Sequence, residues 1–429
     1  MKHQQHTDRH DHEPHNHERH SPKKQALISV AVLCFLVLLT IIAILYGRGY
    51  RIGFQEDRPQ IAKTGILQLT SKPNGAQVYL DDHLTTATDE AINLTPGKYT
   101  VKIAKEGYND WQKDIDITQE VVSRADALLF PKAPTLQSIS TLGVESAVVD
   151  PSGTKIAFRI ASNSAKKNGI YVLEMENRVF PVLAGQASGS QIVDDTLAAF
   201  STAAITWSPD GKQILAAITT DGITTSYLLN AGNFNDVPQD ITPTLQATTD
   251  IWHEQRSDKE KALLESLKVP VRNFVSDNFR ILAWSPDETK ILYQASQSAD
   301  MPVFLKPRLI GNNFLYERRD LEENAIYVYD IKEDINTRIV DSIETLCTAI
   351  EDVSCTTPFT WFPDSGHLVY VHDRKIEIVE DDGANMTTIY AGPFLDHYVY
   401  PWPDGSKLVI LTNLGNQNTP PTLYTISLK

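Results

Sequence analysis

The feature that most constrains this chain of 429 residues is a turn phrase that recurs along its last two thirds. The best copy begins at Trp207 and reads WSPDGKQIL. Pro209 presets φ for a turn, Asp210 can hydrogen-bond its own backbone, and Gly211 tolerates positive φ. One copy would indicate only a turn, but recurrence predicts a repeat architecture. The turn residues that we expect to be structural are Pro151, Gly153, Pro209, Asp210, Gly211, Pro286, Asp287, Pro363, Asp364, Pro403, Asp404 and Gly405.

Each turn separates two apolar runs, and a further alternating strand follows, such as residues 325–330 or 422–426. A sheet that is apolar on both faces must stack against neighbours, and a ring removes the exposed ends. These repeats resemble the propeller repeats of the TolB type, which carry the S-P-D-G signature. The resemblance covers residues 136–429 and implies a β-propeller.

The spacing of the turns sets the expected blade count. The intervals from Pro209 to Pro286 and from Pro286 to Pro363 exceed one repeat of about 40–45 residues. We therefore expect six blades, with seven as the alternative. Residues 257–268 have helical spacing and predict a helical insertion, and residues 301–323 predict a loop without a clear period.

A smaller all-β unit precedes the repeats. Short alternating strands separated by Pro and Gly turns fill residues 64–131 and predict a β-sandwich. The pieces PNGA from Pro73, VYLD from Val78, PGKY from Pro96 and KEGY from Lys105 resemble the PEGA domain family, with Asn74 in place of the Glu that names it. The resemblance implies a domain of surface or envelope proteins without known catalytic residues.

An uncharged apolar run extends from Ala26 to Tyr46. Its length is close to the roughly 20 residues that a helix needs to cross a bilayer. The competing interpretation is a cleaved signal peptide, but no small-residue cleavage site follows. We expect a transmembrane helix over residues 25–47 and a linker over residues 48–63. The flanking positive charges are nearly balanced, so the short N-terminal tail is the argument that places it in the cytoplasm.

Residues 1–24 form a polar tail with seven histidines, which we expect to be disordered and cytoplasmic. Imidazoles at H-x-H spacing can chelate metals weakly, and a merely solvated tail is the alternative. Cys347 and Cys355 could close a disulfide in an oxidising compartment or stay as free thiols. Cys34 lies in the apolar run.

The chain carries no catalytic motif that we recognise. Residues 185–189 have the wrong spacing for a G-x-S-x-G elbow, and His253, His367, His372 and His397 are scattered. The recurring aspartates are expected to cap turns, and Glu380-Asp381-Asp382-Gly383 is either a calcium loop or a solvated acidic turn. A formal charge of −15 argues against nucleic acid.

These observations predict a mainly β protein: one transmembrane helix, a PEGA-like sandwich and a TolB-like propeller. The expected function is that of a non-catalytic, single-pass envelope protein without a cofactor. Its extracytoplasmic domains would bind protein or cell-wall partners. The alternative is an extracytoplasmic hydrolase or lyase with its site in the central channel. Neither the ligand, the oligomeric state nor the envelope type follows from the sequence.

Overall fold

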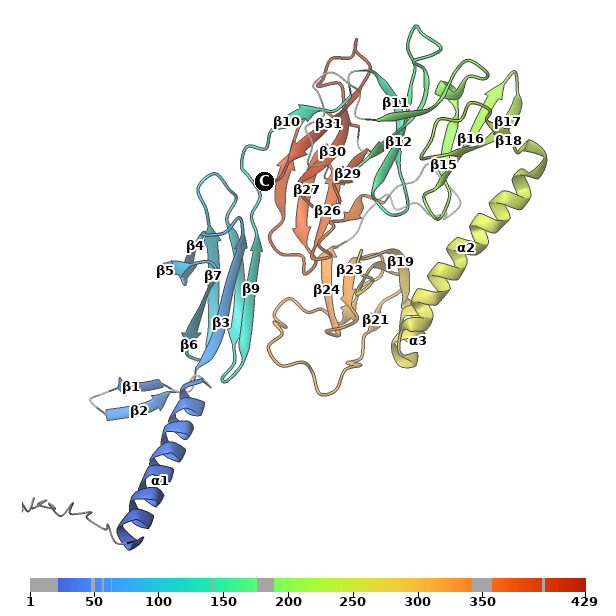
Figure 1. Ribbon diagram of the computed structural model, residues 1–429. Coiled ribbons are helices and arrows are strands. Elements are labelled where there is room, and N and C mark those ends of the chain that lie inside the picture. The colour runs from blue at the N-terminus through green and yellow to red at the C-terminus, as the bar shows by residue number, and fades with distance from the viewer. Residues whose placement is uncertain are drawn as a thin grey trace, which may run out of the picture.

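The computed structural model describes residues 22–47, 51–55, 58–62, 64–140, 142–175, 189–341, 357–395 and 398–429. A helix, a small sandwich and a larger assembly of sheets follow one another along the chain (Figure 1). The predicted mainly β fold class with one N-terminal apolar helix is confirmed.

The N-terminal helix α1 spans Pro22–Gly47. The side chains from Leu27 to Ile44 are exposed, and this segment is long and apolar enough to cross a membrane. A signal sequence near an N-terminus can meet the same criteria of length and composition. Strands β1 (Arg51–Gln55) and β2 (Arg58–Ala62) then pair as a short hairpin, within the stretch that we expected to be a linker.

The sandwich has two sheets, with strand orders β6-β3-β9 and β5-β4-β7-β8. Its strands alternate buried and exposed residues, so each sheet turns one face to the shared core. That core includes Leu67, Leu69, Val78, Ile103 and Trp111. The strands are β3 (Gly65–Lys72), β4 (Gln77–Leu80), β5 (His83–Ala87), β6 (Glu90–Leu94), β7 (Gly97–Ala104), β8 (Trp111–Ile117) and β9 (Val122–Leu128).

Five four-stranded sheets lie in the described residues after residue 135, and we call them blades 1 to 5. Blade 1 holds β11 (Val144–Val149), β12 (Lys155–Ile160), β13 (Gly169–Glu174) and β14 (Ser190–Asp194). Blade 2 holds β15 (Ala204–Trp207), β16 (Gln213–Thr220), β17 (Ile223–Asn230) and β18 (Gln239–Asp240). Blade 3 holds β19 (Phe279–Trp284), β20 (Lys290–Ala295), β23 (Ile326–Asp330) and β24 (Ile335–Val340).

Blade 4 holds β25 (Phe359–Trp361), β26 (His367–His372), β27 (Lys375–Glu380) and β28 (Thr387–Tyr390). Blade 5 holds β29 (Val399–Pro401), β30 (Lys407–Thr412) and β31 (Thr422–Ser427), and β10 (Leu136–Ser138) completes it. Because β10 comes from the start of the assembly and pairs with β31, this blade joins the two ends of the repeat region. The strand arrangement is that of a propeller.

Apolar clusters join four pairs of blades. Blade 5 packs on blade 1, blade 1 on blade 2, blade 3 on blade 4, and blade 4 on blade 5. Alternation within a strand makes this possible: in β20, Leu292 faces blade 4 while Ile291 and Tyr293 face the other way.

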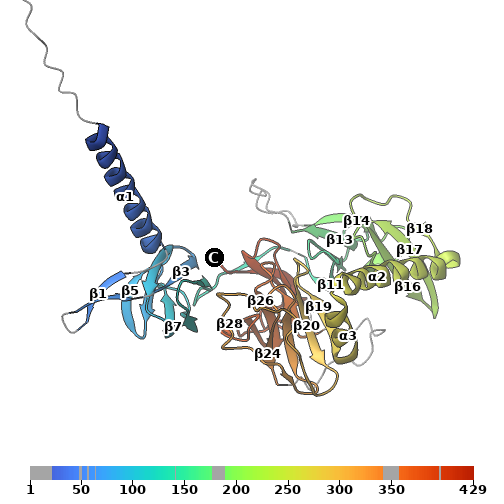
Figure 2. The same cartoon turned by 90° about the horizontal axis from the view of Figure 1, so that it is seen from below.

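No described apolar cluster joins blade 2 to blade 3. The free face of blade 3 is covered instead by Val271 and Val275 of α3 (Val269–Asn278) and by Met301 and Leu321 of the insertion between β20 and β23. That insertion carries two short strands, β21 (Ala299–Asp300) and β22 (Asp320–Leu321). Helix α2 (Leu245–Ser266) runs from blade 2 towards α3 (Figures 1 and 2). The described sheets therefore do not close a ring, and the expected count of six or seven blades stays a prediction.

Candidate functional site

The five repeat turns share one backbone geometry. In each turn the fourth residue donates its backbone N–H to the carbonyl of the first, as Gly211 does to Ser208 at 3.0 Å and Gly405 to Trp402 at 2.8 Å. The fourth residue has positive φ in all five turns: Gly153, Gly211, Glu288, Ser365 and Gly405. The phrase therefore specifies a left-handed position, which glycine fills without strain in three copies.

The turn aspartates are engaged within their own turns. Asp210 accepts hydrogen bonds from the Ser208 hydroxyl at 2.7 Å and from the Lys212 backbone N–H at 3.1 Å. The Ser208 hydrogen bond is the main reason that the pKa of Asp210 lies below its ordinary value. Asp287 accepts from the Ser285 hydroxyl in the same way. Asp404 accepts the Ser406 N–H at 2.9 Å. These are the contacts of capping carboxylates rather than of a shared binding site.

Neighbouring turns touch one another. The Lys155 ammonium of blade 1 donates to the Gly211 carbonyl of blade 2 at 3.4 Å. The Lys290 ammonium of blade 3 donates to the Ser365 carbonyl of blade 4 at 2.9 Å. The structure therefore brings the turns together in pairs along one side of the blades. Pro363, Asp364, Pro403, Asp404 and Gly405, from the turns of blades 4 and 5, face the sandwich across a cleft.

A buried ion pair fastens the sandwich to blade 4. The Lys113 ammonium of β8 contacts the carboxylates of Glu380 and of Asp382, the latter at 2.6 Å. The Trp111 indole N–H and the Asn385 amide also donate to Glu380. Burial by itself lowers the pKa of Lys113, but the two carboxylates outweigh it and the pKa is raised. The acidic turn that could have been a calcium loop or a solvated turn thus receives a lysine from the sandwich.

The edge of β8 is covered by propeller side chains. The backbone N–H of Gln112 donates to the Asn385 side chain at 2.9 Å, and that of Asp114 donates to the Tyr316 hydroxyl at 3.1 Å. The Asn313 amide donates to the Asp114 carbonyl at 2.7 Å. Edge strands with unpaired backbone groups are templates for further pairing. The propeller therefore closes this edge with side chains.

The second edge strand on this side, β9, lines the cleft. The cleft encloses about 900 Å³ between the sandwich and the turns of blades 4 and 5, and we call it the junction cleft. Its sandwich wall includes Lys72 and the β9 residues 124–128. Its propeller wall includes His367 and the two turns named above. This volume lies within the roughly 300–1,000 Å³ typical of ligand sites.

The His367 ring lies at the back of the junction cleft. Its Nδ1 lies 2.7 Å from the Asp364 carboxylate, and the ring meets those of Phe130 and Phe362 edge to face. Burial lowers the pKa of His367, but the hydrogen bond and charge of Asp364 outweigh it and the pKa is raised. Phe130 follows the last sandwich strand, so this contact also holds the two domains together.

A second charged cluster lies beside the junction. The Lys290 ammonium is 2.5 Å from Asp381, with Asp330 at 4.0 Å. Burial raises the pKa of Asp330, Glu333 and Asp381. The adjoining pocket encloses only about 180 Å³, which is below the usual range for a ligand. Among the described residues, no group of His, Cys, Asp and Glu is arranged to hold a metal ion.

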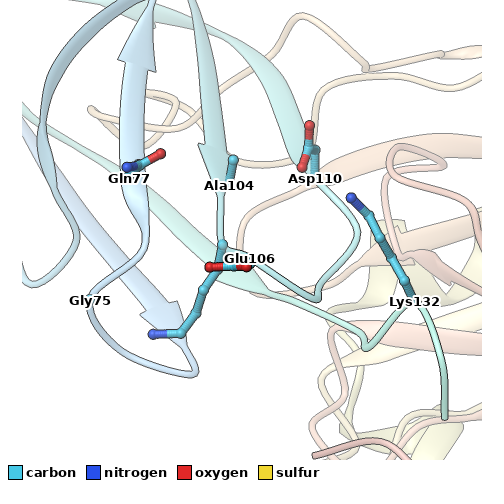
Figure 3. Close-up of a pocket in the computed structure, with 7 residues that line it drawn as sticks. Gly75, Gln77, Ala104, Glu106, Asp110 and Lys132 are labelled. Carbon is cyan, nitrogen blue, oxygen red and sulfur yellow. The ribbon is translucent and has the colours of Figure 1, made fainter.

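A shallower groove of about 520 Å³ lies on the sandwich alone (Figure 3). Asp110 and Lys132 lie along one side of it, and Gln77 and Glu106 lie nearer the other strands. Asp110 is paired with Lys102 at 2.9 Å. The other charged residues that line the groove are Lys105, Glu106 and Lys132.

Sequence reasoning missed the residues that join the domains. Lys113 stands in the apolar phase of its strand, between Trp111 and Ile115, so the alternation marks it as facing inward, but nothing in the sequence names its partners. The run of acidic residues that begins at Glu380 was visible in the sequence, but the sequence does not show which basic residue pairs with it. His253 lies exposed on α2, whereas His397, Cys347, Cys355 and residues 1–21 lie outside the described residues.

Comparison with known families supports the sandwich. Residues 64–130 match the PEGA domain. No curated protein matches the chain. The PEGA resemblance read from the turns of the sandwich is therefore confirmed.

The similar solved structures are propellers. The putative TolB from Agrobacterium tumefaciens has 17% identity, with 66% of this chain and 77% of that chain covered and a TM-score of 0.21. TolB from Acinetobacter baumannii has 14% identity, with 77% and 59% covered and a TM-score of 0.21. The β-propeller domain of the Trilobed protease from Pyrococcus furiosus has 12% identity, with 85% and 95% covered and a TM-score of 0.21.

Proposed function

We propose that this chain is a non-catalytic, membrane-anchored protein of the cell envelope that binds protein or cell-wall partners. In this proposal α1 is a single-pass anchor with the N-terminus in the cytoplasm, and the sandwich and propeller are extracytoplasmic. A PEGA domain that follows an apolar helix fits a protein of the cell envelope.

The observation that carries the proposal is that the charged groups at the junction are already paired with one another. Lys113 forms ion pairs with Glu380 and Asp382. The turn aspartates accept hydrogen bonds within their own turns. A catalytic acid or base needs a free face towards a substrate. Charges that are paired across a domain junction instead hold a binding surface in a fixed shape.

The test is capture of partners by the full-length chain. Tagged protein is crosslinked in intact envelopes, solubilised in detergent and purified, with the isolated α1 segment carrying the same tag as the control. We expect proteins or wall fragments that the control does not recover. Equal recovery by both would refute binding. In intact cells, protease added from outside should remove the propeller; a protected propeller would refute the orientation.

An extracytoplasmic hydrolase or lyase is the second candidate. It is favoured by the raised pKa of Asp330, Glu333 and Asp381, because shifted carboxyl groups gather at active sites. Incubation with peptides and wall polysaccharides would reveal turnover. Turnover that the Asp381→Asn variant loses would replace the first proposal with this one.

A further inference from the structure

The two sandwich edges that face the propeller are treated differently. On β8, the outward N–H of Gln112 and the outward N–H and C=O of Asp114 are bonded by Asn385, Tyr316 and Asn313. Among the strands that the structure describes, β9 pairs with β3 only. Its outer edge lies on the junction cleft from Arg124 to Leu128.

Two hydrogen bonds fix which backbone groups of β9 point outward. The N–H of Ile66 donates to the Val121 carbonyl, and the N–H of Leu129 donates to the Lys72 carbonyl. Odd-numbered residues of β9 therefore face β3, and the even-numbered residues Arg124, Asp126 and Leu128 turn their N–H and C=O groups to the other side. Among the described residues, no backbone or side-chain partner meets these groups.

The insertion between β20 and β23 closes only the start of this edge. A Cβ on Gly311 would lie 2.9 Å from the Val122 carbonyl, so the insertion packs tightly there. Beyond Val122 the wall of the cleft is formed by turns of blades 4 and 5. The open part of β9 has the length of about five residues of extended chain.

We propose that the junction cleft binds an extended peptide segment of a partner protein, which pairs with the free edge of β9 as an added strand. The backbone groups supply the affinity, because a row of outward N–H and C=O groups is matched only by another extended chain. This inference rests on the proposed function, which it deepens by naming the kind of partner and its place.

The outward side chains of β9 set the preference of the site, and the last of them, Leu128, is half-buried against the cluster that holds Phe130. Arg124, Asp126 and Leu128 share the outer face of the sheet, beside Gln68, Thr70 and Lys72 of β3. Arg124 and Lys72 make no ion pair with any described residue. Residues opposite one another on adjacent strands prefer opposite charge or matching apolar character. The bound strand should therefore carry an acidic, a basic and an apolar residue at alternate positions, in that order or reversed.

The test is selection of random linear heptapeptides on the full-length chain in detergent micelles. We expect enriched peptides with the acidic, basic and apolar alternation. In hydrogen exchange, a synthetic copy should protect the outward amides of Arg124, Asp126 and Leu128. Enrichment no greater than on empty micelles would overturn the proposal, as would protection that falls only elsewhere.

The variant Arg124→Pro tests the edge itself. Proline removes the outward N–H of residue 124, and the ladder to β3 uses only the odd residues, so the sandwich should tolerate it. The matched control Arg124→Ala removes the same side chain and keeps the N–H. We expect Arg124→Pro to bind the peptide about tenfold more weakly than Arg124→Ala does. Equal affinity of the two variants would overturn the proposal.

Peptides with a methylated backbone keep the test valid if Arg124→Pro does not fold. In an added strand, every second backbone N–H points to β9. Methylation of those nitrogens should abolish binding, and methylation of the nitrogens between them should leave binding unchanged. Loss of binding in both sets of methylated peptides, or in neither set, would refute strand pairing. Envelope partners captured equally by Arg124→Pro and the unchanged chain would refute the edge but leave the proposed function standing. Peptide binding at the edge, with no envelope partner recovered, would support the edge but refute the proposed function.

Discussion

The joints between blades are built mainly from apolar side chains, whereas the junction between the sandwich and the propeller is built mainly from charged ones. Blades meet through apolar side chains such as Phe158 and Ile326, which are almost completely buried. The sandwich meets blade 4 through Lys113, Glu380 and Asp382, with Phe130 as the main apolar contact nearby. Apolar burial scales with area and has no direction, whereas paired charges demand one geometry.

This difference separates stability from orientation. Blade joints contribute free energy without fixing a precise angle, and they tolerate repeats of variable sequence. A buried ion pair contributes little net free energy once desolvation is counted, but it is costly to leave half-made. We infer that the blade joints hold the fold and that the ion pair sets the angle between the domains, and hence the width of the junction cleft.

The largest effect is expected from truncating a blade joint. Phe158 is 1% exposed, between blades 1 and 5, and stacks on Tyr171 at 5.7 Å. Phe158→Ala should lower the free energy of unfolding by about 3–5 kcal/mol, because it leaves a cavity. Denaturant unfolding measures this. Phe234, which is 45% exposed, is the control, and Phe234→Ala should cost much less. Similar losses for both would mean that this joint is not packed.

A smaller effect with a different signature is expected at the junction. Lys113→Met leaves Glu380 and Asp382 without their cation. Because the three side chains keep 8–19% exposure, the loss of docking free energy should be at or just below the lower end of the roughly 3–5 kcal/mol for a fully buried pair. The propeller itself should melt unchanged, while the amides of Gln112 and Asp114 should exchange faster. Lys102→Met is the control, because its pair with Asp110 is half exposed and exposed pairs contribute about 0–1 kcal/mol. Unchanged exchange in Lys113→Met would show that the ion pair does not set the docking.

The same difference explains what could be predicted from the sequence. Apolar alternation and the turn phrase are local patterns, so the mainly β class, the sandwich and the repeat turns follow from them. Lys113 stands in the apolar phase of β8, which marks it as facing inward. Its partners lie 267 and 269 positions away, and no local pattern names them. The helix around residues 257–268 was expected, but its role in spanning the space between blades 2 and 3 depends on the sheets around it.

A third prediction compares contacts between turns. Gly211 has φ of 66°, and a Cβ there would lie 2.9 Å from the Asp150 carboxylate of the neighbouring blade. Gly222 has φ of 81°, and a Cβ there would meet nothing within 4 Å. Gly222→Ala should cost about 1 kcal/mol from the left-handed backbone alone. Gly211→Ala should lower the free energy of unfolding by about 1 kcal/mol more, because Asp150 of blade 1 must also shift to make room for the added Cβ. Equal losses in thermal unfolding would show that the turns of blades 1 and 2 do not touch.

The smallest effect is a pH dependence at the back of the junction cleft. The pKa of His367 is raised when folded, and its charge faces Asp364, Glu380 and Asp381. Its contribution is therefore complete below the unfolded value of about 6.5 and is lost as pH rises through the folded pKa. The pKa of Asp364 is lowered when folded. Its contribution to stability is therefore present above the unfolded pKa of about 3.9 and is lost as the pH falls further.

The pair should therefore contribute most between about pH 4 and pH 6.5, with an amplitude on the order of 1 kcal/mol. Thermal unfolding of the unchanged chain and of His367→Gln across pH 4 to 9 measures the difference. His253→Gln, on the exposed face of α2, should follow the unchanged chain at every pH. The difference for His367→Gln should shrink above neutral pH. If it is constant instead, the ring holds Phe130 and Phe362 by packing alone, and the junction is more like a blade joint than its charges suggest.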